Sequence, residues 1–145
     1  MNIIERMRSI LQAFPKISVV CNEIKIDFAD KKPTSYGLSS IGDSLIFEDI
    51  IGNQRRKHSF ILYSTFSGIN DFERSENSAA LTELSVWLSK QIGDEVTTEL
   101  DGVSHNGEIT KISAGNGRLY EIEKNNKITG MRYQLQIEVE YTVNF

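Results

Sequence analysis

The chain has 145 residues, a length that suits a single domain spanning 1–145 with a core of its own. Charged residues make up 25% and hydrophobic residues 39%, an ordinary globular balance, and the net charge of -4 differs from the basic surface of nucleic-acid binders. The single cysteine, Cys21, excludes an intrachain disulfide and a cysteine metal cluster.

The first segment predicts a helix that packs on a core. Apolar residues recur with helical spacing and Pro15 ends the run: Ile3, Ile4, Met7, Ile10, Leu11 and Phe14. The segment lacks the apolar stretch and cleavage site of a secretory signal, and no run approaches the roughly 20 apolar residues of a membrane span. We therefore expect a soluble protein that is made in the cytosol and does not bind membranes.

The next segments alternate between strand and loop patterns. Residues 17–28 predict a strand, whereas residues 30–43 are rich in Lys, Pro, Ser and Gly and predict a long loop. Two interpretations of this loop remain open: a functional or mobile loop, and a solvated excursion with Tyr36 and Leu38 against the core. Residues 45–51 then predict a short strand, with a hairpin turn at Gly52-Asn53.

The return strand of this hairpin opens with a basic stretch. Arg55, Arg56, Lys57 and His58 are consecutive, and residues 60–66 are apolar or small on both faces, which indicates a central strand. We weigh two interpretations of the basic stretch evenly: contact with an acidic protein partner, and a solvated hairpin tip. Recognition of nucleic-acid sequence is not expected, because no aromatic residues are interleaved and the protein is acidic.

A second and longer helix is predicted over residues 71–92. Asn70 and Glu73 match a capping box, Gly93 is a stop signal, and an apolar stripe consists of Ala80, Leu81, Leu84, Trp87, Leu88 and Ile92. Strands follow at 108–114 and 118–123, with turn signals at Asp101-Gly102, Asn106-Gly107 and Gly115-Asn116-Gly117.

The closing segment is the most regular part of the chain. From Arg132 to Val143 polar and apolar residues alternate without a break. The apolar face should lie in the core beneath Trp87 and Leu84, and it consists of Tyr133, Leu135, Ile137, Val139, Tyr141 and Val143. The opposite face carries Gln134, Gln136, Glu138 and Glu140, and it is a candidate working surface. The element order predicts an α+β fold with an antiparallel (mixed) β-sheet flanked by two main helices.

Residues that could carry catalysis are scattered. His58 and His105 lie in different strand–turn regions and have no neighbouring cysteine or histidine, so neither a metal site nor a cofactor site is predicted. His58 is expected at the surface. Gly115-Asn116-Gly117 joins two strands and opens no helix, and no serine has the flanking glycines of a nucleophile elbow. The carboxylate pairs Asp27/Asp30 and Glu48/Asp49 lack a reason to meet in a pocket. We expect no enzyme.

Several stretches resemble small proteins encoded in the tail-assembly gene clusters of phages and prophages of Gram-positive bacteria, some of which are labelled minor capsid proteins. The stretches are Phe28-Ala29-Asp30, Pro33 to Ser40, Tyr63 to Arg74, Gly107 to Ala114 and Tyr133 to Ile137. The likeness covers nearly the whole chain. The element order is similar to that of the tail terminator (tail completion) proteins of long-tailed phages.

This resemblance implies a structural role. In that family an antiparallel sheet is flanked by helices, and six copies form a ring that caps the tail tube, ends its elongation and offers the surface where a head docks. In contractile particles the ring also holds the last ring of the sheath, and headless phage-tail-like bacteriocins use the same cap. The resemblance therefore implies a homohexamer at the head-proximal end of a tail, assembled in the bacterial cytoplasm, with the tube protein, a sheath protein and a head–tail connector as partners.

The resemblance carries over no interface residue, so the interface predictions come from the residues themselves. They are Arg55, Arg56, Lys57, Tyr36, Gln134, Gln136, Glu138 and Glu140. The rival interpretations are a head–tail connector or neck adaptor, and a small-ligand-binding module or enzyme.

Overall fold

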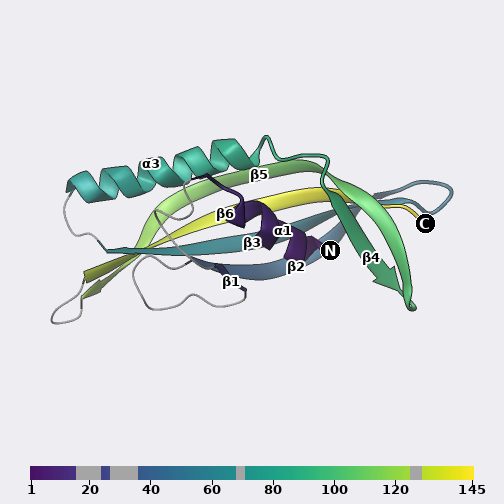
Figure 1. The fold of residues 1–145 in the computed structure, drawn as a ribbon, viewed down its shortest axis with the longest axis horizontal. Helices are drawn as coiled ribbons and strands as arrows, with labels where there is room; N and C mark the ends of the chain where they lie inside the picture. Colours follow the sequence, from purple (N-terminus) through teal and green to yellow (C-terminus); the bar gives the residue numbers. More distant parts are fainter. Residues whose placement is uncertain (16–23, 27–35, 68–70, 125–128) are drawn as a thin grey trace.

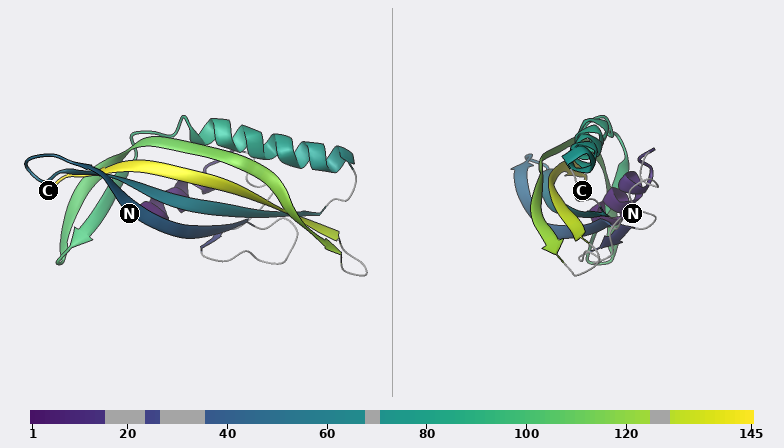
Figure 2. Two further views of the ribbon diagram at one scale, coloured as in Figure 1. Left: turned by 180° about the vertical axis from the view of Figure 1, so that it is seen from behind. Right: turned by 90° about the vertical axis from the view of Figure 1, so that its left-hand side faces the viewer.

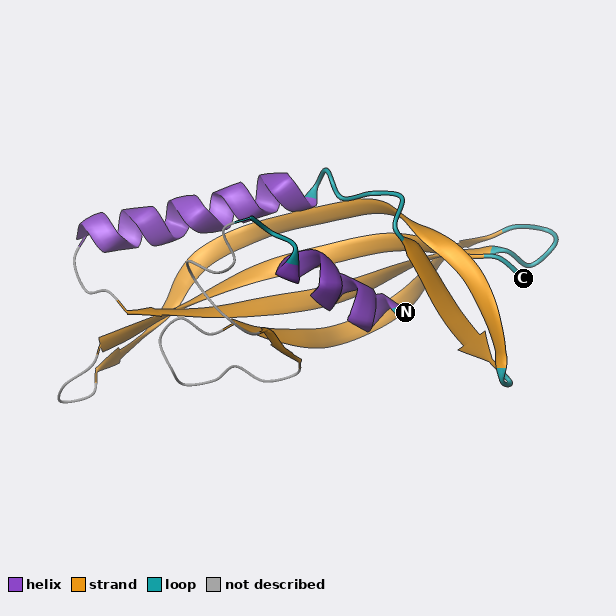
Figure 3. Ribbon diagram, in the orientation of Figure 1, coloured by secondary structure: helices purple, strands orange, loops and turns teal. Residues whose placement is uncertain are grey.

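The computed structural model describes residues 1–15, 24–26, 36–67, 71–124 and 129–145, with side chains described for 1–15, 37–63, 79–115 and 133–145. Within these ranges the chain forms helices α1 (Ile3–Gln12) and α3 (Asp71–Leu88) (Figures 1 and 3). The strands are β1 (Ile24–Ile26), β2 (Tyr36–Glu48), β3 (Gln54–Ser67), β4 (Glu95–Leu100), β5 (Val103–Lys124) and β6 (Thr129–Val143).

The strands form one sheet in the order β1-β2-β3-β6-β5-β4. Every neighbouring pair is antiparallel except β1 and β2, which are parallel. The sheet curls into a half-barrel, and both helices lie along it (Figure 2). The predicted α+β fold, a mixed and mainly antiparallel sheet with two helices, is confirmed.

The core lies on the concave face of the sheet. The alternating residues of β6 that were predicted to face inward are all buried: Tyr133, Leu135, Ile137, Val139, Tyr141 and Val143. They belong to one cluster with Met7 and Leu11 of α1 and with Leu84 of α3, so both helices cover this same face. Fully burying a large aliphatic or aromatic side chain contributes roughly 1.5–3 kcal/mol, so this cluster is the main source of stability.

The N-terminal segment caps α1 and also covers one edge of the sheet. The Asn2 side chain accepts a hydrogen bond from the Glu5 amide at 2.8 Å, and Glu5 accepts one from the Asn2 amide at 3.3 Å, which completes a capping box. The Thr97 amide of β4 donates to the Met1 carbonyl at 2.9 Å, and Arg6 Nε donates to the Glu95 carbonyl at 2.8 Å. Part of the outer edge of β4 is therefore hydrogen-bonded.

The predicted loop over 30–43 is wrong from residue 36 onward. Tyr36 to Asp43 belong to β2 and pair with β3 from Ser64 back to His58. Gly and Ser disfavour strands only weakly, and pairing with an apolar neighbour outweighs that preference. Residues 30–35 lie outside the described residues, as do most of the predicted strand at 17–28, Cys21, Asp27 and the capping residue Asn70.

Two predicted turns are also wrong, because β5 runs through both. Asn106-Gly107 pairs with β4 at Thr97 and Val96, and the stretch from Gly115 to Gly117 forms an irregularity in the pairing with β6. The turn at Asp101-Gly102 is confirmed, with positive φ at both residues. Strand β2 ends at Glu48 and not at residue 51, and α3 ends at Leu88 and not at residue 92, where Ile92 is exposed.

Candidate functional site: an apolar arm and its polar brace

One end of the molecule carries an unusual concentration of exposed apolar side chains. They lie on the second half of β2 and on the turn that follows, and we call residues 41–51 the apolar arm. Phe47 is 61% exposed and Ile51 is 74% exposed, and the full set is Ile41, Leu45, Ile46, Phe47, Ile50 and Ile51. Leu45 pairs with Arg56 and Phe47 with Arg55, so the exposed side chains lie on both faces of the strand. A concentration of exposed apolar side chains marks a site of interaction.

The turn of the arm is held in one conformation by its own hydrogen bonds. Asp49 Oδ1 accepts from the amides of Ile51 at 3.0 Å and Asn53 at 2.9 Å. Gly52 has a φ of +95°, which glycine adopts without strain, as the Gly52-Asn53 turn signal predicts. Ile50 and Ile51 are thus presented to solvent by a defined turn.

The outer edge of the arm is open within the described part of the chain. β1 pairs with β2 only from Tyr36 to Leu38, and every residue from Ile41 to Glu48 is exposed. Proteins usually shorten, charge or cover an edge strand, because its unpaired amides and carbonyls recruit other strands. The arm therefore combines exposed apolar side chains with an edge that no described strand covers.

A polar cluster fastens the base of the arm to the core. We call Asp43, Arg56, His58 and Tyr141 the brace. Arg56 Nε donates to Asp43 Oδ1 at 2.6 Å, His58 Nδ1 lies 2.9 Å from Asp43 Oδ2, and the Tyr141 hydroxyl donates to the same oxygen. The cluster joins β2, β3 and β6, and charge-assisted hydrogen bonds of this kind are stronger than neutral ones.

The brace shifts the pKa values of its members. Burial raises the pKa of the Asp43 carboxyl, but hydrogen bonds from Tyr141, Arg56 and His58 outweigh it, and the net pKa lies below the usual 3.8. Burial, together with the hydrogen bond to the Asp43 carboxylate, raises the pKa of Tyr141 above its usual 10.0. Asp43 is thus held as a carboxylate and Tyr141 as a neutral phenol.

Ser40 extends the cluster into the order Ser–His–Asp. Its Oγ lies 2.7 Å from His58 Nε2, on the far side of the imidazole from Asp43. In serine hydrolases this order activates the serine, because the aspartate stabilises the imidazolium that forms. Here Arg56 already neutralises the Asp43 carboxylate, which weakens that stabilisation.

The structure separates the predicted basic stretch onto two faces. His58 is buried with 7% exposure and lies beside the Phe60 ring, so the expectation of a surface histidine is wrong. Strand alternation places Arg56 on the same concave side, where it binds Asp43, and Arg55 and Lys57 on the convex side. The backbone of Tyr36 lies at the other end of β2, where it pairs with Ser64.

The predicted polar face of β6 lies on the convex side of the sheet. Gln136 and Glu138 are exposed, whereas Gln134 and Glu140 are half-buried. Lys57 Nζ lies 3.9 Å from Glu138 Oε1, and Lys111 Nζ lies 3.9 Å from Glu140 Oε2, distances that contribute little at a surface. Gln136 and Glu138 also border a shallow hollow with Ser113, Ala114 and Gly115.

Sequence analysis missed both the arm and the brace. A signal for the brace was present, because counting back in steps of two from the apolar Leu62 and Phe60 reaches His58 and Arg56 on the core-facing side. Their partner Asp43 was assigned to the predicted loop. Tyr141, 98 residues further along the chain, could be paired with it only once the strand order was known.

Among the described residues, no group of three His, Cys, Asp or Glu side chains is placed to hold a metal ion. The described helices include none with the length and apolar character of a membrane span. Comparison of the sequence with models of known protein families finds no match, and a search of curated proteins finds no similar sequence.

Proposed function

We propose that this chain is a structural tail terminator of a phage or phage-tail-like particle. Six copies would form a ring that caps the tail tube, ends its elongation and offers the surface where a head docks. The tube protein is the main partner, and a contractile particle adds the sheath protein. The proposal starts from the resemblance of the sequence to proteins of tail-assembly clusters.

The structural observation that supports this proposal is the apolar arm. Exposing Phe47, Ile50 and Ile51 to water, beside a strand edge that no described strand covers, does not stabilise a monomer. In a subunit that binds a neighbouring copy, the contact would cover both the apolar side chains and the strand edge. The described helices pack on the concave face, and Glu138 on the convex face is exposed.

Deletion of the gene, followed by electron microscopy of the particles, tests the proposal. We expect overlong or unfinished tails, and a plasmid copy of the gene should restore the normal length. Tails of normal length that fail to join heads would favour the alternative of a head–tail connector or neck adaptor. Particles of normal length and infectivity would end both proposals.

A second candidate, a serine hydrolase, is favoured by one observation, the Ser40–His58–Asp43 order. It ranks second because Arg56 neutralises Asp43. Incubation with a p-nitrophenyl ester and with a fluorophosphonate probe separates the two functions. The structural proposal predicts no turnover or labelling that depends on Ser40. Activity that Ser40→Ala removes, and that Ser44→Ala on the same strand retains, would support the hydrolase.

A further inference from the structure

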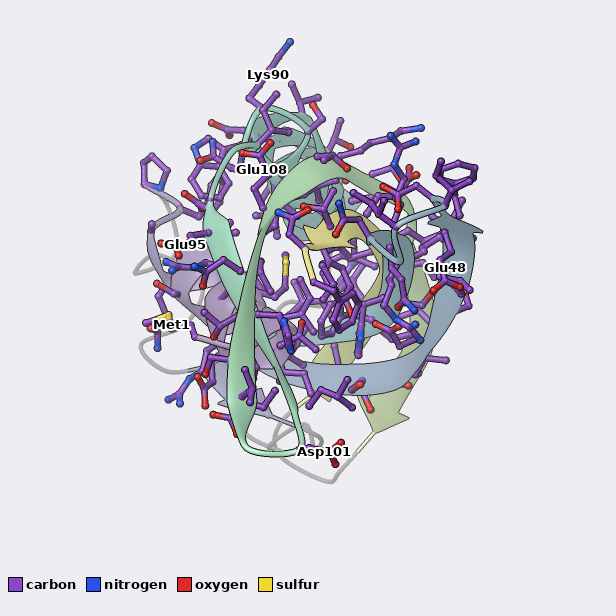
Figure 4. All side chains as sticks on the ribbon, turned by 90° about the vertical axis from the view of Figure 1, so that its right-hand side faces the viewer. Met1, Glu48, Lys90, Glu95, Asp101 and Glu108 are labelled. Carbon is purple, nitrogen blue, oxygen red and sulfur yellow. The ribbon has the colours of Figure 1, made fainter. Side chains whose placement is uncertain are left out.

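The end of the molecule that carries the arm also carries a second exposed apolar surface. It lies at the tip of the β4–β5 hairpin, where Leu100 is 53% exposed and Val103 is 57% exposed. Figures 1 and 2 show both hairpin tips at this end, and Figure 4 looks onto it with Glu48 and Asp101 at separate places around the rim. The two apolar surfaces do not cover each other.

The strand order places these surfaces at opposite margins of the sheet. Beyond Leu38 the strand β1 no longer pairs with β2, so at this end β2 and β4 are the two outermost of the described strands. Two different unpartnered patches on opposite margins are what a head-to-tail contact between identical subunits requires. An isologous dimer could bury both patches only if the arm and the hairpin tip of one copy met the hairpin tip and the arm of the same partner at once. The placement of the two patches on opposite margins of the sheet disfavours that arrangement.

The hairpin is acidic, and the margin beside the arm presents one exposed basic residue, Arg55, of opposite charge. From Glu95 to Glu108 the β4–β5 hairpin has four acidic residues and no Lys or Arg: Glu95, Glu99, Asp101 and Glu108. The β3 strand beside the arm has Arg55, Arg56 and Lys57 in succession, but Arg56 binds Asp43 and Lys57 lies near Glu138. The arm itself also carries the acidic residues Glu48 and Asp49. Arg55 is exposed on the convex side and makes no ion pair with any described residue, so it is available to an acidic neighbour. Such complementarity sets the orientation and partner choice of a contact.

We propose that the apolar arm of one copy docks on the tip of the β4–β5 hairpin of the next copy, with Arg55 facing Glu99 and Asp101. The occupant of the arm is thus a second copy of this chain in a heterologous contact. The proposal rests on the proposed function, since a ring of six copies needs a contact of this type. It assigns that contact to a specific pair of surfaces.

A mixing experiment with the full chain tests the proposal. One variant disables the arm (Ile50→Asp with Ile51→Asp), and another disables the hairpin tip (Leu100→Asp with Val103→Asp). All four residues are exposed, so both variants should fold. We expect the wild-type chain to self-associate in sedimentation velocity and each variant alone to stay monomeric. Mixed together, the variants should form a 1:1 dimer that grows no further, because each retains the surface that the other lacks.

Charge exchange gives an independent measurement of the same contact. Arg55→Glu should weaken self-association by about tenfold or more, because it opposes like charges. Adding Glu99→Arg and Asp101→Arg should recover much of the loss. Val86→Asp with Ile92→Asp is the matched control, since it places two charges at exposed apolar sites away from both surfaces and should leave association unchanged.

Four results would overturn the assignment of the contact. Two concern single chains: the wild type stays monomeric at its highest soluble concentration, or the variant with Leu100→Asp and Val103→Asp associates alone. The other two are a mixture of the arm and hairpin variants that stays monomeric, and a control variant (Val86→Asp with Ile92→Asp) that associates as poorly as they do. The failure of the proposed function is distinguishable. If gene deletion leaves normal tails but the mixture forms the dimer, the contact stands without the tail role. If deletion gives overlong tails that both variants correct, the tail role stands without this contact.

Discussion

At the scale of single residues, the brace is the most consequential feature. Asp43 accepts hydrogen bonds from Arg56 and Tyr141 and contacts His58. One carboxylate on β2 therefore binds three side chains from β3 and β6. Removing one partner from such a cluster leaves the others unsatisfied, which costs more than the net value of the bonds themselves. Among the brace residues, replacing Asp43 should therefore lower the free energy of unfolding most.

We expect Asp43→Asn to lower the free energy of unfolding by about 1–3 kcal/mol at neutral pH, as for a broken hydrogen-bonded network. Urea unfolding followed by circular dichroism measures this loss. Asp101→Asn is the control, because Asp101 is exposed in a turn with φ 51°, a conformation that asparagine tolerates. Equal stability of the Asp43→Asn variant and the wild type would show that the brace is not structural.

The same residue predicts a dependence of stability on pH. Because folding lowers the pKa of Asp43 below 3.8, its contribution is present above that value and is lost as the pH falls through the lowered folded pKa. On acidification the free energy of unfolding of the wild type should therefore fall, and this acid-dependent loss should be absent from Asp43→Asn.

Tyr141 predicts the opposite dependence, because its pKa is raised above 10.0 in the folded chain. Its contribution to stability is lost as the pH rises beyond that value, and Tyr141→Phe should remove this dependence. Unfolding curves at a series of pH values would reveal each dependence and its absence from the variant.

At the scale of elements, β5 is notable for its close crossing with β6. At Gly107 a Cβ atom would lie 1.7 Å from the Thr142 carbonyl oxygen, so only glycine fits. Glu108 donates its amide to Thr142 Oγ1 at 3.0 Å, and Asn144 donates its amide to the Asn106 carbonyl at 2.9 Å on the other side. This contact joins the first part of β5 to the end of β6.

Gly107→Ala should force the two strands apart and destabilise the fold by about 1–3 kcal/mol or more, the range for overpacking. Thermal unfolding measures the effect. Gly115→Ala on the same strand is the matched control, because nothing lies within 4 Å of its added methyl group, and it should be close to neutral. If neither variant changes the thermal stability, the strands can separate at Gly107 without destabilising the fold.

Prediction from sequence succeeded for elements whose side chains alternate without interruption, and it failed where local composition and pairing disagree. The faces of β6 and the helical stripe at Leu81, Leu84 and Leu88 follow from periodicity alone. The first half of β2 was missed because Gly37, Ser39, Ser40 and Gly42 hide its alternation, and its pairing with β3 is a long-range property. The brace could not be assembled for the same reason, since Tyr141 reaches Asp43 only after the sheet forms.

At the scale of the whole molecule, the two edges of the sheet differ in their hydrogen bonding. The edge of β4 is bonded to Met1 and Arg6, whereas the edge of β2 from Ile41 to Glu48 has no described strand beside it. Hydrogen exchange measured by mass spectrometry on the dilute chain should show this asymmetry. We expect fast exchange for 41–48 and the slowest exchange in β6, which lies between two strands. Protection of 41–48 equal to that of β6 would contradict an open edge.

The exposure of the arm has an evolutionary consequence. Phe47, Ile50 and Ile51 are outside the core cluster, so polar replacements there should cost the fold little and should improve solubility. Selection for a stable monomer would therefore let these positions drift toward polar residues while Asp43 and His58 are retained. If descendants of this chain keep apolar residues in the arm, selection for a contact between molecules keeps them there. The substitution rate at these positions would then measure how strongly the organism depends on that contact.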